Sequence, residues 1–179
     1  MNVSDVTPIL LDGTAVQRAL SRLAHEILEK NRGVEHLVLV GIRSRGVHLA
    51  GRIQAKLREL TGGIVPVGSI DITPYRDDVE EPRERIEATT TDLPASIDDR
   101  VVVLVDDVIA TGRTVRVALD VLGGLGRPRA VQVAALVDRG NREVPIRADY
   151  VGHNLAPSVH GRVNVRVREL DGTDEVALR

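Results

Sequence analysis

The feature that most constrains this chain is an aliphatic run that ends in two carboxylates. Residues 101–105 are all valine or leucine, and Asp106 and Asp107 follow directly. Such a continuous run is typical of a strand in a parallel sheet, because helices cover both faces of that kind of sheet. An amphipathic segment at residues 115–125 comes shortly afterwards. The sequence therefore predicts a buried parallel strand, a loop at its carboxyl end and a helix.

The loop between this strand and this helix has the composition of a phosphate site. Residues 111–114 (T-G-R-T) would present backbone N–H groups and hydroxyls at a helix N-terminus, where an anion is favoured. Asp106 and Asp107 stand just before them, where they could hold sugar hydroxyls or a hydrated metal ion. This combination suits a ribose 5-phosphate. The alternative is a generic strand–turn–helix with two solvated aspartates.

The bulk composition indicates an ordinary globular protein. The chain has 179 residues, and we expect one domain over residues 1–179. It has no cysteine, which excludes disulfides and thiolate metal sites. No apolar run approaches the length of a membrane span, and no signal peptide precedes the first helical pattern. We therefore expect a soluble, cytoplasmic protein without a membrane partner.

Arginine dominates the basic residues. Of the 24 basic side chains only Lys30 and Lys56 are lysine, and the formal net charge is −2. Guanidinium groups bind phosphates and carboxylates through two parallel hydrogen bonds. Tryptophan and phenylalanine are absent and tyrosine occurs twice, which excludes aromatic platforms for stacking RNA bases. Any binding of nucleic acid must depend on arginine.

The remaining segments alternate between strand and helix patterns. Asp12 or Thr14 can cap the first helix. This helix has its apolar positions at residues 16–28 and ends at residues 31–33, and a second helix is predicted at residues 46–60. Strands are predicted at residues 36–42, 64–73, 130–137, 148–151 and 162–167. This alternation predicts an α/β fold whose central parallel sheet has helices on both faces and a small, irregular C-terminal part. Ligands of such sheets bind beyond the carboxyl ends of the strands.

A long connection at residues 74–99 interrupts the alternation. It contains several prolines and a mixed run of charges. Connections of this length in a compact domain are usually functional or disordered. We expect a mobile lid whose Tyr75 and Arg76 close over the substrate and exclude water. A solvated surface loop is the alternative.

Two further segments end at the same predicted sheet edge. The turn G-I-R-S-R-G at residues 41–46 follows the first strand, and its arginines and glycines allow close approach to a diphosphate. The segment at residues 136–152 follows another strand and is rich in charge. Taken alone, each of these is equally compatible with an ordinary solvated loop.

Six segments of this chain, in the same order, resemble the bifunctional pyrimidine operon regulator and uracil phosphoribosyltransferase family of bacteria. These segments are R-A-L-S-R-L-A-H-E-I (18–27), V-G-I-R-S-R-G (40–46), I-D-I-T-P-Y-R-D-D (70–78), L-V-D-D-V-I-A-T-G-R-T-V-R (104–116), G-R-P (126–128) and L-V-D-R-G-N-R-E-V-P-I-R-A-D-Y-V-G (136–152). The resemblance covers essentially the whole chain. The fourth segment also resembles the 5-phosphoribosyl-1-pyrophosphate (PRPP) motif of type I phosphoribosyltransferases.

The resemblance implies a type I phosphoribosyltransferase fold with a small C-terminal hood. It implies the reaction of uracil with PRPP to give UMP and pyrophosphate, with Mg²⁺ as cofactor. It also implies regulation of pyrimidine genes by UMP-dependent binding to a leader mRNA, and a homo-oligomeric protein. Two alternatives remain: an RNA-binding regulator with vestigial catalysis, and a phosphoribosyltransferase for another base without an RNA role.

The resemblance also assigns residues. It places Asp106, Asp107, Tyr75 and Arg76 at the reaction centre. Residues 110–114 would hold the 5-phosphate, Ser44 and Arg45 the pyrophosphate, and Val137 and Asp138 would flank the base. The full set of substrate contacts is Arg43, Ser44, Arg45, Asp106, Asp107, Val108, Ile109, Ala110, Thr111, Gly112, Arg113, Thr114, Val137 and Asp138. No protein group would bind Mg²⁺ directly; the substrate and water would hold it.

The resemblance places RNA contacts at Arg18, Arg22, His25, Arg142 and Arg147. The first three share one face of the predicted N-terminal helix, and we expect all five to form one basic surface. Two positions of this surface depart from the family pattern. Asn141 stands where the family has histidine, and His153 stands where it has lysine.

Overall fold

The computed structural model describes residues 8–72, 91–93, 96–156 and 158–179. Its centre is a five-stranded sheet in the order β3-β2-β4-β5-β6, and every pair of neighbours is parallel. The strands are β2 (Leu37–Ile42), β3 (Val67–Ile70), β4 (Val101–Ile109), β5 (Ala130–Asp138) and β6 (Tyr150–Asn154). The predicted α/β class with a parallel sheet is confirmed.

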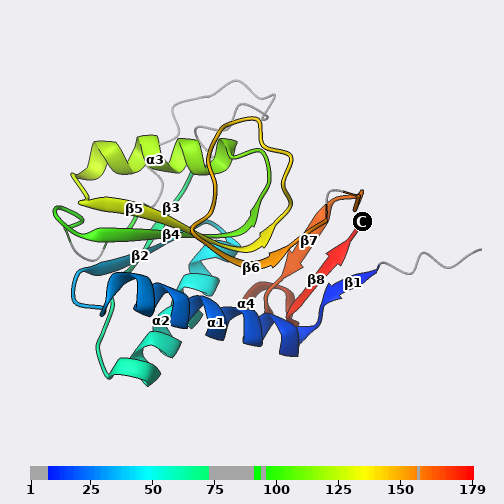
Figure 1. The fold of residues 1–179 in the computed structure, drawn as a ribbon, viewed down its shortest axis with the longest axis horizontal. Coiled ribbons are helices and arrows are strands. Elements are labelled where there is room, and N and C mark those ends of the chain that lie inside the picture. Colours follow the sequence, from blue (N-terminus) through cyan, green and yellow to red (C-terminus); the bar gives the residue numbers. More distant parts are fainter. Residues whose placement is uncertain (1–7, 73–90, 94–95, 157) are drawn as a thin grey trace, which may run out of the picture.

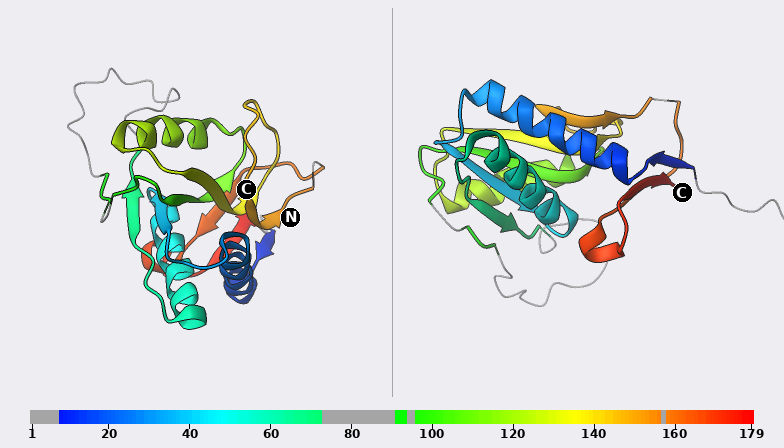
Figure 2. Two further views of the ribbon diagram at one scale, coloured as in Figure 1. Left: turned by 60° about the vertical axis from the view of Figure 1, so that its left-hand side comes forward. Right: turned by 90° about the horizontal axis from the view of Figure 1, so that it is seen from below.

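Helices cover both faces of this sheet, as predicted. Helices α1 (Gly13–Asn31) and α2 (Arg45–Thr61) lie on one face, and α3 (Arg113–Leu125) lies on the other (Figures 1 and 2). Asp12 caps α1, since its side chain accepts a hydrogen bond of 2.7 Å from the N–H of Ala15. Helix α1 begins directly after this cap, and α2 and α3 begin one and two residues before their predicted starts, because capping turns carry no hydrophobic pattern.

Strand β4 explains why two separate cores form. Its side chains alternate between the two faces of the sheet. Val103 and Val105 pack in the cluster under α1 and α2, whereas Val102 and Leu104 pack in the cluster under α3. All four of these side chains are at most 1% exposed. The aliphatic run therefore reflects burial on both sides.

The C-terminal part forms a second, small sheet, which corrects the expectation of an irregular region. Strands β1 (Ile9–Leu11), β8 (Glu175–Leu178) and β7 (Val163–Arg166) pair in this order and antiparallel. The short helix α4 (Arg168–Asp171) connects β7 to β8. This small sheet lies beside one end of the central sheet (Figure 1). Of its strands, the sequence predicted only β7.

Much of the predicted lid lies outside the described residues, including Tyr75 and Arg76. The end of that connection is described. The backbones of Asp92 and Ser69 exchange hydrogen bonds of 2.8 and 2.9 Å, which extends the sheet beyond β3. Ile97 is buried under α3. Among the helices within the described residues, none has the length and apolar character needed to cross a membrane.

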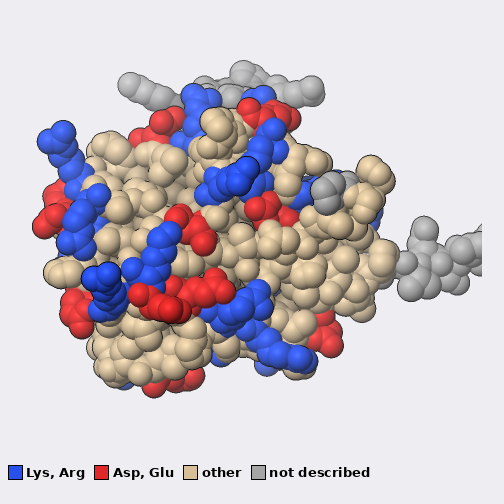
Figure 3. Space-filling model, viewed as in Figure 1, with Lys and Arg blue, Asp and Glu red and all other residues tan. Residues whose placement is uncertain are grey.

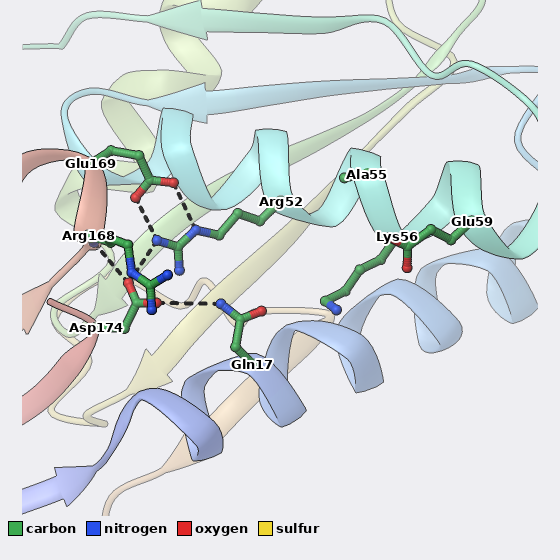
Figure 4. Close-up of a pocket in the computed structure, with 8 residues that line it drawn as sticks. All are labelled: Gln17, Arg52, Ala55, Lys56, Glu59, Arg168, Glu169 and Asp174. Atoms are coloured by element: carbon green, nitrogen blue, oxygen red, sulfur yellow. Dashed lines mark hydrogen bonds and ion pairs between the residues drawn. The ribbon is translucent and has the colours of Figure 1, made fainter.

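A partly buried ion-pair network holds the small sheet against α2 (Figure 4). Arg52 Nε and Nη2 donate to Glu169 at 2.9 and 2.6 Å, and Nη2 also donates to Asp174 at 2.7 Å. Asp174 is only 6% exposed and also accepts the backbone N–H of Arg168 at 2.8 Å. Burial tends to raise the pKa of Asp174, but these donors outweigh it and hold the pKa below its ordinary value of 3.8.

We predict that Asp174→Asn destabilises the protein by about 3 kcal/mol at pH 7, because it leaves Arg52 with an incompletely paired buried charge. The lowered pKa of Asp174 means that its carboxylate stabilises the fold fully above the ordinary value of 3.8 and loses this effect as the pH falls through the folded value. The free energy of unfolding, measured in urea at several pH values, tests both points.

Asp120→Asn is the control for this prediction. The Asp120 carboxylate is 71% exposed and lies 4.0 Å from Arg116, so its loss should change the stability by less than about 0.5 kcal/mol. If Asp174→Asn unfolded in urea like this control at pH 7, the network would have no role in stability.

Candidate functional site

The two carboxylates at the end of β4 point to opposite sides of the sheet, since neighbouring side chains of a strand alternate. Asp106 is only 6% exposed, and its Oδ1 accepts the N–H of Asp107 at 2.9 Å. Asp107 is partly exposed, and its Oδ1 accepts the N–H of Val108 at 2.8 Å. Asp107 shares its side of the sheet with Val103 and Val105, which is the side of the small sheet. It is therefore the more accessible of the two carboxylates.

The turn after β2 packs tightly against the end of β4. The N–H of Arg43 donates to the carbonyl of Ile70 at 2.9 Å, which keeps the turn next to β3. A Cβ atom on Gly46 would lie 2.3 Å from the carbonyl oxygen of Val105 and 3.4 Å from the Cα of Asp106. Only glycine permits this approach. The turn carrying Arg43, Ser44 and Arg45 thus reaches the carboxylates, as predicted for two loops of one sheet edge.

A cavity of about 330 Å³ lies between the end of β4 and the small sheet. It is lined by Arg45, Asp107, Arg162, Arg179 and residues 163–165. Three of its lining residues are arginines and one is an aspartate, so basic residues outnumber acidic ones. Such a lining suits a diphosphate, because guanidinium groups bind phosphate oxygens in pairs.

Arg45 already has an anionic partner in this structure. Its Nη2 lies 3.0 and 3.3 Å from the two carboxylate oxygens of Asp171, at the end of α4. The pKa of Asp171 is lowered by a hydrogen bond from the backbone N–H of Val167 and also by Arg45. Arg43 Nη2 donates to the hydroxyl of Ser69 at 3.3 Å. A bound diphosphate would compete with Asp171 for Arg45.

The predicted phosphate loop, residues 110–114, runs from the end of β4 into α3. Gly112 has φ of 87°, in the left-handed region that favours glycine, and it caps the helix. The carbonyl of Thr111 accepts the N–H groups of Glu143 and Val144 at 2.9 and 3.0 Å. Arg113 is exposed and forms an ion pair of 2.6 Å with Glu143. The loop is thus held against residues 139–147, which we name the turn segment.

The residues predicted to flank the base end strand β5. Val137 is fully buried, and Asp138 is partly buried. Asp138 Oδ1 accepts the N–H of Gly140 at 2.8 Å, and Oδ2 accepts from Arg142 at 2.6 Å. Strand β5 pairs with β4, so this carboxylate lies next to the end of β4, where Ile109 is its register partner. Val108 is partly exposed and Ile109 is buried.

The predicted RNA residues divide into two groups. Arg18 and Arg22 line a hollow of about 480 Å³ between α1, β1 and β6, and His153 lines the same hollow. Arg22 also donates to the carbonyls of Val151 and Gly152. His25 and Arg147 are exposed. Arg142 differs, since its side chain is only 18% exposed and turns inward to Asp138.

Sequence reasoning missed three residues of this region: Arg162, Asp171 and Arg179. None lies in a motif, and all belong to the small sheet and its connection, whose pairing the sequence did not predict. In the sequence, their charge is the only property that could have pointed to a role in binding an anion or a cation.

Comparison with known families decides what kind of fold this site belongs to. Residues 7–166 match the model of the phosphoribosyl transferase domain. The chain belongs to this family. Two curated relatives are each named "Bifunctional protein PyrR". The one from Limosilactobacillus fermentum is 52% identical over 171 residues, covering 94% of this chain and 96% of the relative. The one from Chloroflexus aurantiacus is 54% identical over 169 residues, covering 94% and 93%.

Solved structures agree with this family assignment at the level of the fold. The crystal structure of a hypoxanthine phosphoribosyltransferase from Staphylococcus aureus superposes with a TM-score of 0.71 over 97% of this chain and 91% of that chain. The two sequences are 21% identical, so the likeness establishes the phosphoribosyltransferase fold and nothing about the base. The predicted family and fold are therefore confirmed.

We predict that Asp107→Asn lowers kcat/KM of phosphoribosyl transfer. The loss should correspond to an increase of about 2–4 kcal/mol in activation free energy, the usual effect of removing one preorganised electrostatic contact. The reason is that this carboxylate is partly exposed and borders the cationic cavity. Steady-state kinetics with PRPP measure the effect. Asp120→Asn on α3 is the control and should retain wild-type kinetics. Wild-type kinetics of Asp107→Asn would remove this carboxylate from the site.

Proposed function

We propose that this chain transfers ribose 5-phosphate from PRPP to uracil, giving UMP and pyrophosphate, and that it also regulates pyrimidine genes by UMP-dependent binding to leader mRNA. The observation that carries the enzymatic part is the meeting of three loops at one sheet edge. These loops are the phosphate loop, the turn with Arg45, and the end of β5 with Asp138. The relatives named "Bifunctional protein PyrR" support the combination of two roles.

The three loops, together with the two carboxylates and the cavity, correspond to the parts of PRPP and to the acceptor base. The phosphate loop offers N–H groups and hydroxyls at the start of α3 for the 5-phosphate. Asp106 and Asp107 precede that loop at the end of β4, and Asp107 also borders the cavity; we expect these carboxylates to address the ribose hydroxyls. The cavity with Arg45, Arg162 and Arg179 would take the pyrophosphate. Val137 and Asp138 would border the base on the neighbouring strand.

The residues of this edge also fit a hydrated magnesium ion. Mg²⁺ prefers oxygen ligands and keeps several waters, binding through one or two carboxylates together with substrate phosphates. Asp107 supplies such a carboxylate beside the cationic cavity, and only its Oδ1 has a hydrogen-bond partner among the described residues. When bound, the ion would neutralise charge on the departing pyrophosphate.

The reaction needs charge and position rather than a protein nucleophile. The bond between ribose C1 and the pyrophosphate oxygen breaks, its electron pair leaves with pyrophosphate, and uracil N1 bonds to C1 and loses its proton to solvent. The sugar carries positive charge in the transition state, which the carboxylates of Asp106 and Asp107 would stabilise. The guanidinium groups of Arg45, Arg162 and Arg179 would stabilise the departing anion.

We predict Mg²⁺-dependent formation of UMP from uracil and PRPP, with little or no product from hypoxanthine or guanine under the same conditions. Steady-state assays of the three bases in parallel, each with and without a chelator, test this expectation. If the enzyme preferred a purine, that base and not uracil would be its substrate. No product with any base, together with retained binding of UMP, would leave a regulator with vestigial catalysis.

The support for RNA binding comes from the hollow beside α1. Basic side chains lie together over the half of α1 that follows β1, and acidic groups border them (Figure 3). Arg18 and Arg22 supply cations at this hollow, and His25 and Arg147 are exposed. The phosphate backbone of RNA dominates such binding, so a local group of arginines suffices despite the net charge of −2.

We predict that affinity for a pyrimidine-leader stem-loop, measured with UMP present, falls steeply with salt. Replacing Arg18, Arg22 and Arg147 together by glutamine should reduce the log–log salt slope by about one unit for each arginine that contacts a phosphate. Gel shifts at several salt concentrations measure this slope. Arg58→Gln, an exposed arginine of α2, is the control. An unchanged slope in the triple variant would refute this RNA surface.

A further inference from the structure

Arg142 directs its guanidinium group into the protein. Its Nε donates to the carbonyl of Ile146 at 2.7 Å, and its Nη2 donates to the carboxylate of Asp138 at 2.6 Å. Its Nη1 donates to the carbonyl of Ala110 at 2.6 Å and to that of Gly140 at 3.3 Å. Four of its five N–H donors therefore have acceptors inside the protein, and the side chain is only 18% exposed.

These bonds fasten the turn segment to the ends of both β4 and β5, at the point where the pairing of these two strands stops. Ala110 opens the phosphate loop, and Asp138 ends strand β5 at the side proposed for the base. The turn segment can reach both because Gly140 and Asn141 adopt φ of 76° and 57°, which folds the chain back on itself. Asparagine tolerates this left-handed conformation better than most residues. Arg142 thus bridges the phosphate side and the base side of one ligand site.

The same bonds orient the amide groups of the phosphate loop. In a trans peptide unit the C=O and the following N–H point in opposite directions. Arg142 holds the carbonyl of Ala110, and the N–H groups of Glu143 and Val144 hold the carbonyl of Thr111. The N–H groups of Thr111 and Gly112 must therefore point away from the turn segment. Their direction leaves them available to a phosphate group at the start of α3.

We propose that Arg142 is a positioning residue for the 5-phosphate of the nucleotide, acting through the carbonyl of Ala110, and that it is not itself an RNA contact. This inference rests on the proposed function, because it takes the ligand of the phosphate loop to be UMP or PRPP. The interaction requires arginine. Its planar, forked group reaches four separate acceptors at once, whereas a lysine ammonium has one nitrogen and glutamine lacks the charge.

The experiment compares UMP with uridine, which lacks the phosphate, in calorimetric titrations of the wild type, Arg142→Gln, Arg142→Lys and Arg58→Gln. We expect Arg142→Gln to weaken UMP binding about tenfold or more, the usual effect of losing hydrogen bonds from a charged group. Uridine binding should change by less than about twofold, because the N–H of Gly140 still holds Asp138 at the base side and the sugar contacts remain. Arg142→Lys should lie between Arg142→Gln and the wild type, and Arg58→Gln should match the wild type.

Kinetics provide a second readout that a purely structural role would not produce. In Arg142→Gln the KM for PRPP should rise more than the KM for uracil. Melting temperatures identify any general loss of stability, and the milder Arg142→Lys variant keeps the test valid if Arg142→Gln does not fold. Equal losses for UMP and uridine, or unchanged UMP binding, would overturn the proposal. Failure of the wild type to bind UMP at all would instead refute the proposed function.

Discussion

The burial of β4 between two parallel neighbours is the constraint on which the rest of this structure depends. Its side chains are covered on both faces, and its backbone pairs with β2 on one side and β5 on the other. Parallel pairing brings the carboxyl ends of these strands to a single edge. Each loop of the candidate site follows one of these strands. Any change that shifts the register of β4 would therefore separate the carboxylates, the phosphate loop and the cationic turn.

Arginine has two distinct tasks in this chain. Exposed arginines such as Arg18 and Arg147 are available to ligands, whereas Arg52 and Arg142 are largely buried and tie together segments distant in sequence. The buried pairs succeed because each has several acceptors, so the cost of removing the charge from water is offset. With no phenylalanine or tryptophan to fill the space between segments, such forked groups provide specific contacts there.

Much of the fold could be predicted, because its signals are local. The aliphatic runs of β2, β4 and β5 and the apolar periodicity of α1 and α2 each lie within one short segment. Strands β1 and β8 could not be predicted in this way. They are three and four residues long, and they pair with each other across the length of the chain. Their stability comes from that pairing and from the Arg52 network, neither of which leaves a periodic pattern in sequence.

The sequence by itself determined the sheet, its helices and the position of the phosphate loop, since burial patterns and turn conformations depend on residues that are neighbours in the chain. Only the tertiary structure decided what each arginine does. Arg142 and Arg147 stand in one motif with the same charge, yet one turns inward and the other is exposed. The carbonyl of Ala110, 32 residues away, accepts a hydrogen bond from Arg142 and holds it inside the protein. An acceptor that distant belongs to the packing of the loops, and no spacing within the motif could reveal it.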